Sequence, residues 1–510
     1  MRTLKSLKIR MYRGILGDCF LLRATVDEAG ADVTRSILID CGVLQNVAAG
    51  ADMIKDLDDE VVAAVGKERL AQVEAGPSRI SAIARNVIEE VNGRIDLLVI
   101  THEHYDHLSG FLFERERFFH NDFVIGQLWM AWTENPKDEQ AKALRERFAK
   151  GKRALAAAVA LAQTEAGKTN ARLQNVASLA AFAGPLPQAG MAIGGSLGTA
   201  DILQMLKDKA GSDATSFLEP GQAIELADFG LNAYVLGPPR DETLLRKDTP
   251  SHGSGKEVYL TRLDAAEAAE SAARAQLGLK GEGDAVPFSS VYARPIPKEP
   301  TDKGREVKDL YYNEKEHWRR IENEWTSSIE ALALKMDSDT NNTSLALAFE
   351  LPDGQVLLFP GDAQVGNWLS WNNQSYPTPA DANSNLKSAT AEDLLRRVTF
   401  YKAGHHGSHN STLKQLGLER MKDPRLVAAI PVVEAVAAVQ GKGRTKPGKG
   451  WQMPFGELYK TLNEKTKGRI MQGDGDPETE RQAFIDNPTG DIPVVIEHDD
   501  LFAELTFAFA

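Results

Sequence analysis

The residues best suited to chemistry are concentrated in one short segment, residues 101–107, which we call the histidine motif. Its sequence is Thr-His-Glu-His-Tyr-Asp-His, so three of the ten histidines in the 510-residue chain fall within six consecutive positions. Imidazole nitrogens and carboxylate oxygens are common ligands of zinc and related divalent metals. A solvated polar loop would not need this clustering, and the motif therefore predicts a metal site.

The spacing within the histidine motif suits two ions. His102 and His104 are two residues apart and can point to one ion from an extended turn, whereas Asp106 and His107 can turn towards a second ion. The motif follows residues 95–100, a short apolar and β-branched run that predicts a buried parallel strand. Ligands of open α/β sheets bind beyond the carboxyl ends of the strands, which is where this strand would deliver the motif.

Three other apolar runs end in residues of the same chemical kind. Residues 36–42 end in Asp40-Cys-Gly, residues 356–363 end in Gly-Asp362-Ala, and residues 398–408 end in Lys-Ala-Gly-His-His-Gly-Ser. Each run predicts a core strand that carries polar residues at its end. A single Gly-Asp pair would be a weak signal, but four such segments in order form a strong one.

In this order the four segments resemble the motifs of the metallo-β-lactamase fold, and residues 14–22 resemble its opening strand. The resemblance implies an α/β protein, a two-sheet αββα sandwich with helices outside, which is interrupted in this chain by mainly helical insertions. It also implies two divalent metal ions. Asp362 would bridge both ions, and one histidine of the pair at residues 405–406 would complete the second site.

The variant of the motifs is closer to one branch of this superfamily. Residues 402–408, together with Asn341-Asn342-Thr343-Ser-Leu, resemble the nuclease-like domain of ComEC-type DNA-uptake proteins, and phosphorylcholine esterases are similar over the same stretch. Many hydrolytic relatives have Gly-His-Thr where this chain has Asn341-Asn342-Thr343, so the third-motif histidine is missing. His120, His252 and His317 are expected at the surface rather than as replacements.

The missing histidine affects the expected metal. A site with more oxygen and water ligands tolerates manganese or magnesium better than a closed nitrogen cage does. We therefore expect two divalent ions, Zn or Mn.

Roles can be assigned around these ions. Successive residues after a strand point to opposite sides, so only one of the two adjacent histidines should be a ligand. We assign His406 as ligand beside Asp106 and His107, and His405 as proton donor or phosphate contact. Asp40 is expected to orient a ligand histidine through its other ring nitrogen. Lys402 either neutralises substrate charge or forms a structural ion pair.

The predicted site residues fall into three groups. The metal ligands are His102, His104, Asp106, His107, Asp362 and His406; the catalytic residues are Asp106, His405 and Lys402; the substrate contacts are Asn342, Ser408, Lys442, Arg444, Lys446 and Trp451.

The charge distribution bears on the substrate. The net charge of −13 argues against a broadly basic nucleic-acid binder. Residues 441–450, which we call the basic loop, nevertheless carry four positive and no negative charges and precede Trp451. If this loop lies over the metals it would attract a phosphate backbone, with the indole available to stack on a base. A solvated loop is the equally weighted alternative.

Location and cysteine use are less informative. No apolar run approaches the about 18 residues of a membrane span, and residues 1–13 alternate like a strand with one wet face rather than a signal peptide. Cys19 and Cys41 are expected to pack in core strands. We expect a cytoplasmic protein without a membrane partner. ComEC-type proteins carry this domain on a membrane channel, which this sequence lacks, so DNA uptake is not implied.

The composition changes along the chain predict a core split by two insertions. The metallo-β-lactamase core is expected at residues 1–132, 201–239 and 336–510, with an alanine-rich helical insertion at 133–200 and a charged insertion at 240–335. The insertions are expected to be solvated surface segments without a role in the site. They could also form a lid over the metals, a surface for a protein partner, or a homo-oligomer contact.

Three functions are compatible with these features. The first is a metal-dependent phosphodiesterase, most simply a nuclease acting on DNA or RNA. The second is a hydrolase of a small ester, such as a phosphorylcholine ester, a lactone or a thioester, which an apolar pocket without a basic rim would favour. The third is a non-catalytic binding module, which the retention of the predicted ligands disfavours.

Overall fold

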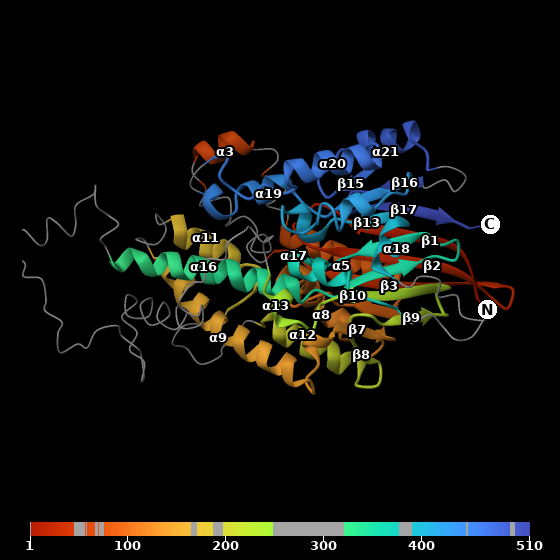
Figure 1. Cartoon of the computed structure of the whole chain (residues 1–510), viewed down its shortest axis with the longest axis horizontal. Coiled ribbons are helices and arrows are strands. Elements are labelled where there is room, and N and C mark those ends of the chain that lie inside the picture. Colours follow the sequence, from red (N-terminus) through yellow and green to blue (C-terminus); the bar gives the residue numbers. More distant parts are fainter. Residues whose placement is uncertain are drawn as a thin grey trace, which may run out of the picture.

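The computed structural model describes residues 2–44, 57, 59–66, 70, 76–164, 171–186, 197–247, 321–376, 390–444, 447–489 and 495–509. The described elements form two β-sheets with helices around them (Figure 1). Most of the predicted charged insertion, including its expected helix at residues 263–277, lies outside these residues.

The first sheet contains eight strands in the order β16-β17-β1-β2-β3-β5-β7-β8. The strand β17 pairs antiparallel with β1, so the last described strand closes onto the first, while β3, β5, β7 and β8 run parallel. The bounds are β1 (Thr3–Tyr12), β2 (Cys19–Glu28), β3 (Ala31–Cys41), β5 (Leu97–Val99), β7 (Leu128–Ala131), β8 (Thr215–Leu218), β16 (Val495–His498) and β17 (Phe502–Ala508).

The second sheet contains seven strands in the order β15-β14-β13-β12-β11-β10-β9. The strands β12 to β15 run parallel, so the two predicted strands that end in Gly-Asp and in the histidine pair are neighbours. The bounds are β9 (Ala223–Leu226), β10 (Leu231–Gly237), β11 (Ala346–Glu350), β12 (Val356–Phe359), β13 (Val398–Lys402), β14 (Val427–Ile430) and β15 (Ile470–Gln472).

The main core lies between the two sheets. On β1, Leu7, Ile9 and Met11 are buried in the same apolar cluster as Phe359 and Phe400 of the second sheet. This is the two-residue period expected of strands that bury one face against a facing sheet. The sequence expectation of an α/β sandwich of two sheets is confirmed.

Helices cover the outer faces of both sheets. The helix α5 (Gly76–Glu90) buries Ile80, Ile83 and Val87 in the cluster on the outside of the first sheet, and α20 (Gly456–Thr466) contacts β14 and β15 of the second. Other described helices on these faces include α17 (Val365–Trp371), α18 (Ala391–Arg396), α19 (Glu434–Ala438) and α21 (Pro477–Asp486).

The helical insertion forms a bundle at the end of the sandwich away from both termini (Figure 1). The helices α9 (Glu139–Ala162), α11 (Ala171–Ala180) and α16 (Ile321–Asn342) share an apolar cluster. Within the predicted helical insertion at residues 133–200, the described residues include the helices α9 and α11. The helix α16, however, runs across the boundary expected at residues 335/336, because a continuous helix joins the bundle to the core.

Two further elements were not expected. Residues 201–239 were predicted as core strands, but α12 (Thr199–Ala210) occupies the start of this range. The predicted strand at 95–100 divides into two pieces, and its outer piece, β4 (Arg94–Ile95), pairs with β6 (Val124–Ile125) in a separate small sheet. Among the described helices, none is long and apolar enough to cross a membrane.

Candidate metal centre

Four predicted ligands from both halves of the chain meet at one buried point. One ligand atom from each of Asp106, His107, Asp362 and His406 lies within 4.8 Å of the others. Asp106 and His107 lie in α6 (Tyr105–Leu108), which follows β5 in the first sheet, whereas Asp362 and His406 follow β12 and β13 in the second. All four residues are fully buried, so the sandwich assembles this cluster from chain segments about 250 residues or more apart.

The two histidines of this cluster are held in a defined orientation. His107 Nδ1 lies 2.7 Å from Asp40 Oδ2, and His406 Nδ1 lies 2.8 Å from the carbonyl oxygen of Pro431. Both acceptors require Nδ1 to carry a proton, so in the neutral ring the lone pair is on Nε2. The structure therefore gives Asp40 the orienting contact that the sequence predicted, and turns both Nε2 atoms into the cluster.

Both Nε2 atoms face carboxylates. The distance from His107 Nε2 to Asp362 Oδ2 is 3.2 Å, and that from His406 Nε2 to Asp106 Oδ2 is 2.9 Å. A lone pair so close to a carboxylate oxygen requires a cation between them, either a proton or a metal ion. Burial lowers the pKa of both imidazoles, but the surrounding carboxylates outweigh it and raise both pKa values. The donor set and its charge therefore fit a divalent ion.

His102 and His104 lie beside this cluster. The ring of His102 is 4.6 Å from that of His104 and 4.2 Å from that of His107, measured between centroids. Burial is the largest influence on both; it lowers the pKa of His102 well below its usual value and that of His104 to about 3. Both rings are therefore neutral near pH 7, as metal ligands must be.

Buried atoms without partners gather at the same place. Among the described residues, the buried side-chain atoms with no hydrogen-bond partner include His102 Nε2, His104 Nδ1, Asp106 Oδ1, Asp337 Oδ1 and His405 Nε2. Buried polar atoms in folded proteins normally have a partner. Because all five are of the kinds that bind metals, the residues present fit the two ions that the sequence predicted.

Lys402 lies inside the site, and its ammonium group points to protein atoms rather than to solvent. Its Nζ lies 2.9 Å from Asp362 Oδ1, donates to the carbonyl oxygen of Gly361 at 2.8 Å and also pairs with Asp18 Oδ2. Its side chain is only 2% exposed. Of the two predicted roles, the structure shows the ion pair: all three donor directions are used by the protein, so Lys402 balances internal carboxylates rather than substrate charge.

His405 is placed differently from His406. Its Nδ1 lies 3.1 Å from the hydroxyl oxygen of Ser408, and that hydroxyl donates to Asn410 Oδ1. In the tautomer in which Nδ1 donates to this serine oxygen, the unpartnered Nε2 keeps a lone pair, whereas the amide nitrogen of Gln364, 3.5 Å from Nδ1, would favour the other tautomer. Burial lowers the pKa of His405 to about 4. Both histidines have positive φ, 44° for His405 and 54° for His406, which is uncommon for residues other than glycine and accompanies the turn after β13.

Two predicted substrate contacts have structural partners. Asn342 is fully buried; its amide donates to the carbonyl oxygen of Lys247, and its Oδ1 accepts from the backbone N–H groups of Gln364 and Asn367. It thus holds the start of α17. Ser408 is 5% exposed and contacts His405, which makes it a neighbour of the cluster.

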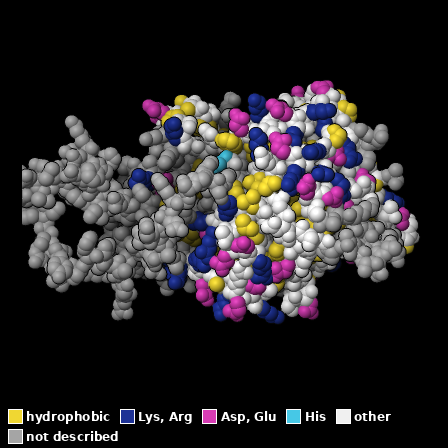
Figure 2. Space-filling model, viewed as in Figure 1, with side chains coloured by type: hydrophobic (Ala, Val, Ile, Leu, Met, Phe, Trp, Pro, Cys, Tyr) yellow, Lys and Arg dark blue, Asp and Glu magenta, His cyan; other side chains and the backbone are white. Residues whose placement is uncertain are grey.

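The predicted basic loop is only partly described. Residues 441–444 form a short 3-10 helix beside α11, but the side chains of Lys442 and Arg444 and the whole of Lys446 lie outside the described residues. Lys449 is exposed. On the face shown in Figure 2, acidic and basic side chains are interspersed over the described residues. The predicted phosphate contact therefore stays a prediction. His120, expected at the surface, is 64% exposed, and His252 and His317 lie outside the described residues.

The helical insertion covers the metal centre. Phe182, which follows α11, has its ring 5.5 Å from that of His104 and 5.8 Å from that of His405. It stacks on Trp451 at 5.3 Å. The carbonyl oxygen of Phe182 accepts from the backbone N–H of Tyr105 at 2.7 Å. Trp451, predicted to stack on a substrate, thus stacks on Phe182 in this structure.

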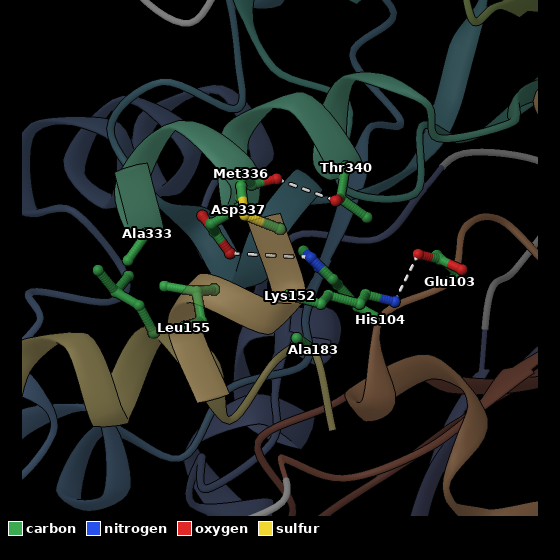
Figure 3. Close-up of a pocket in the computed structure, with 10 residues that line it drawn as sticks. Glu103, His104, Lys152, Leu155, Ala183, Ala333, Met336, Asp337 and Thr340 are labelled. Carbon is green, nitrogen blue, oxygen red and sulfur yellow. Dashed lines mark hydrogen bonds and ion pairs between the residues drawn. The ribbon is translucent and has the colours of Figure 1, made fainter. Parts of the chain in front are cut away.

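A small cavity lies between this cover and the histidine motif (Figure 3). The helices contribute Leu155, Leu179, Ala333 and Met336 to its wall, and a Glu103–Lys152 ion pair of 2.7 Å joins the motif to α9. His104 and Asp337 also line it, with 4.0 Å between His104 Nε2 and Asp337 Oδ1.

Sequence reasoning missed three residues of the site: Asp18, Phe182 and Asp337. Asp18 lies within residues 14–22, which resemble the opening strand, and directly precedes β2, so its position was a detectable signal. Phe182 and Asp337 lie in segments predicted as insertion and as its boundary, and no local pattern distinguishes them.

The comparison with protein families supports the part of the site that comes from the first half of the chain. The sequence model of the metallo-beta-lactamase superfamily matches residues 30–193, which include β3, β5 and the whole histidine motif. No curated protein and no solved structure matches the chain.

Proposed function

We propose that this chain, in which residues 30–193 match the metallo-beta-lactamase superfamily, is a metal-dependent phosphodiesterase with two ions in its active site. One observation carries the proposal: the ligand atoms of Asp106, His107, Asp362 and His406 lie within 4.8 Å of one another in a buried cluster. When bound, two divalent ions would lower the pKa of a water molecule and stabilise negative charge on the reacting group.

The protein's own residues prepare this chemistry. Asp40 and the carbonyl oxygen of Pro431 keep His107 and His406 in the ligand tautomer. Lys402 holds the Asp362 carboxylate in place, and its positive charge keeps the pKa of Asp362 well below the usual value even though burial opposes this. Asp362 therefore stays ionised throughout the pH range in which the protein would work.

His405 is the proposed proton carrier. Its Nε2 has no partner among the described residues, and it holds a lone pair in the tautomer in which Nδ1 donates to Ser408. In this state the ring can accept a proton at Nε2 and give it back to a leaving oxygen later in the cycle. From the sequence His405 was expected to be a proton donor or a phosphate contact; the proposal makes it a proton acceptor in the resting state and a donor later in the cycle.

The phosphodiester substrate is supported by the resemblance of residues 402–408 to a nuclease-like domain. The side chains that cover the site limit the shape of the substrate, because His102 and His104 are only 2% and 3% exposed. Only a narrow part of a substrate can reach these histidines beneath Phe182 and Trp451. Within the predicted DNA or RNA class, we therefore propose a single-stranded end or a small phosphodiester rather than an intact duplex.

A small-ester hydrolase is the second candidate. One wall of the cavity beside His104 is formed by Leu155, Leu179, Ala333 and Met336, and its one lysine is paired with Glu103. An apolar wall of this kind suits the acyl or choline part of a small ester better than a polyanion.

The test compares these substrates on protein loaded with manganese or zinc. Bis-para-nitrophenyl phosphate, single-stranded DNA and RNA represent phosphodiesters, and a lactone and a thioester represent the second candidate. We expect phosphodiester cleavage, reduced by orders of magnitude in Asp362→Asn. Asp122→Asn, a change at an exposed carboxylate, should leave it unchanged.

The outcomes separate the candidates. Cleavage of the lactone or thioester alone would replace the phosphodiesterase proposal with the second candidate. Metal binding without hydrolysis of any substrate would point to the non-catalytic module.

A further inference from the structure

We propose that Asp337 is a positioning residue, whose carboxylate accepts a hydrogen bond from Nε2–H of His104 and so keeps the lone pair of that ring on Nδ1, where a metal ion would bind. The carboxylate itself would not touch the ion. Asp337 lies on α16, outside the four segments that predicted the metal centre. The proposal rests on the metal-binding part of the proposed function and is independent of the substrate.

The first observation is a pattern shared by the other three predicted ligand histidines. Each has an oxygen near Nδ1: the Thr101 hydroxyl 3.0 Å from His102, Asp40 Oδ2 2.7 Å from His107, and the Pro431 carbonyl 2.8 Å from His406. The Thr101 hydroxyl donates to Asp40, so its oxygen can accept from His102. An acceptor at one ring nitrogen fixes the proton there and leaves the lone pair on the other nitrogen. These three rings are therefore set to bind metal through Nε2.

His104 has the opposite arrangement. Its Nδ1 is buried and has no hydrogen-bond partner among the described residues, whereas its Nε2 lies 4.0 Å from Asp337 Oδ1. Figure 3 shows the two side chains pointing towards each other across the cavity. His104 thus needs its acceptor at Nε2 rather than at Nδ1, and Asp337 Oδ1 is an oxygen that faces this nitrogen.

The second observation is that the carboxylate is held in place and still has an atom to offer. Oδ2 of Asp337 accepts from the amide of Asn341 at 3.3 Å, whereas Oδ1 has no hydrogen-bond partner among the described residues. The nearby lysine of the same helix, Lys335, pairs with Asp339 instead. A buried oxygen without a partner is unfavourable. A hydrogen bond to His104 would satisfy both side chains.

The distance between the two atoms must shorten for this contact. A separation of 4.0 Å is too long for a hydrogen bond, and a closure of about 1 Å would bring it to the usual length. Both residues line the same cavity, so a small side-chain rotation has room to supply this closure. The helix α16 would then prepare the metal centre without contributing a ligand, in the way that Asp40 does for His107.

The first experiment measures metal binding without an activity assay. Purified metal-free protein is titrated with Zn²⁺ and Co²⁺ in a calorimeter, and the visible absorption of Co²⁺ reports the ligand field. We expect two ions in the wild type. In Asp337→Asn one ion should bind about 10- to 100-fold more weakly. The saturated variant should keep the Co²⁺ band pattern, because the ligand atoms are unchanged. The control Asp339→Asn removes a carboxylate from the same helix and should bind both ions normally.

Nuclear magnetic resonance of the zinc-loaded protein, labelled with ¹⁵N at histidine, reads the tautomer itself. The wild type should carry the ring proton of His104 on Nε2 and those of His102, His107 and His406 on Nδ1. The His104 signal is identified by its loss in His104→Ala. In Asp337→Asn this proton should move upfield and exchange faster with water, because its charged acceptor is gone. A residue with a merely structural role would leave the signal in place.

The double variant His104→Ala/Asp337→Asn tests whether Asp337 acts through His104. Its affinity should be close to that of His104→Ala alone, because the acceptor has no ring left to orient. A further loss of affinity in the double variant would contradict this pathway.

Other outcomes would overturn the proposal in distinguishable ways. A wild-type His104 proton on Nδ1 would do so without any variant, and a lost Co²⁺ band pattern in Asp337→Asn would show direct coordination instead. If the wild type binds two ions and Asp337→Asn binds both with unchanged affinity, only the role of Asp337 fails. If the wild type binds fewer than two, the two-ion site of the proposed function fails as well.

Discussion

At the scale of single residues, the metal centre is dominated by negative charge. Asp18 and Asp362 pair with the buried ammonium group of Lys402, and Asp106 and Asp337 are also buried at the site. Burial raises the pKa of Asp337 well above its usual value, and the charges of Asp106 and Asp362 raise it further. The site therefore attracts cations strongly, and protons compete with metal ions for it.

Asp40 controls the tautomer of one ligand, and its replacement should weaken metal binding. In Asp40→Asn the new side chain can no longer guarantee an acceptor for His107 Nδ1–H, so the lone pair is no longer fixed on Nε2. We expect the affinity for the ion that His107 would hold to fall about 10- to 100-fold, with little change in secondary structure. Chelator competition measures the affinity and circular dichroism the fold, with Asp122→Asn as the matched control. Unchanged affinity would show that Asp40 serves only to hold Thr101.

At the scale of elements, the junction between the first sheet and the helical insertion contains a buried titratable group, the carboxyl of Glu134. The short helix η1 (Trp132–Glu134) follows β7 and places Glu134 between α9, α12 and the histidine motif. Burial raises the pKa of Glu134 to about 7, and the nearby charge of Glu103 adds to this. Because the folded pKa lies above the ordinary value of 4.5, this group favours folding below about pH 4.5, and the contribution is lost as the pH rises through about 7.

Glu134→Gln should therefore stabilise the protein at alkaline pH. The glutamine keeps the shape without the buried charge, and the gain at pH 8 should be on the order of 3 kcal/mol at most, shrinking towards zero near pH 4.5. Urea unfolding at the two pH values measures it. The exposed Glu116→Gln is the control and should show no such pH dependence. A gain that is equal at both pH values would contradict the assignment of a raised pKa.

At the scale of the whole molecule, the metal centre joins two halves that the chain keeps far apart. Residues 102–107 follow a strand of the first sheet, and Asp362 and His406 follow strands of the second. The helices α9, α11 and α16 close over this seam (Figure 1). Bound ions would thus link both sheets.

Removal of metal should lower the stability of the entire fold. A ligand present at about 100 times its dissociation constant stabilises the native state by about 2.7 kcal/mol per independent site. We expect chelation to lower the melting temperature of the wild type, with recovery on adding Mn²⁺ or Zn²⁺. Calorimetry checks this, and His102→Ala/His104→Ala is the comparison. In that variant the effect of chelation should shrink, and an undiminished effect would place the stabilising ion elsewhere.

The sequence by itself determined the strands and what stands at their ends. Apolar runs with a two-residue period must be buried between sheets, and residues 101–107, Asp362 and the histidine pair directly follow such runs, so local pattern predicted core strands with polar residues at their ends. The resemblance to metallo-β-lactamase motifs supplied the two-sheet sandwich and the roles of Asp362 and the histidine pair as ligands. Only the tertiary structure decided which partners these residues meet. Lys402 pairs with Asp18 and Asp362, His406 rather than His405 joins the ligand cluster, and α16 brings Asp337 to His104. These contacts join positions that are distant along the chain, and a local pattern holds no information on distances across the fold. The packing of the two sheets and of the insertion fixes them, because each helix must bury its apolar face where the sandwich leaves room.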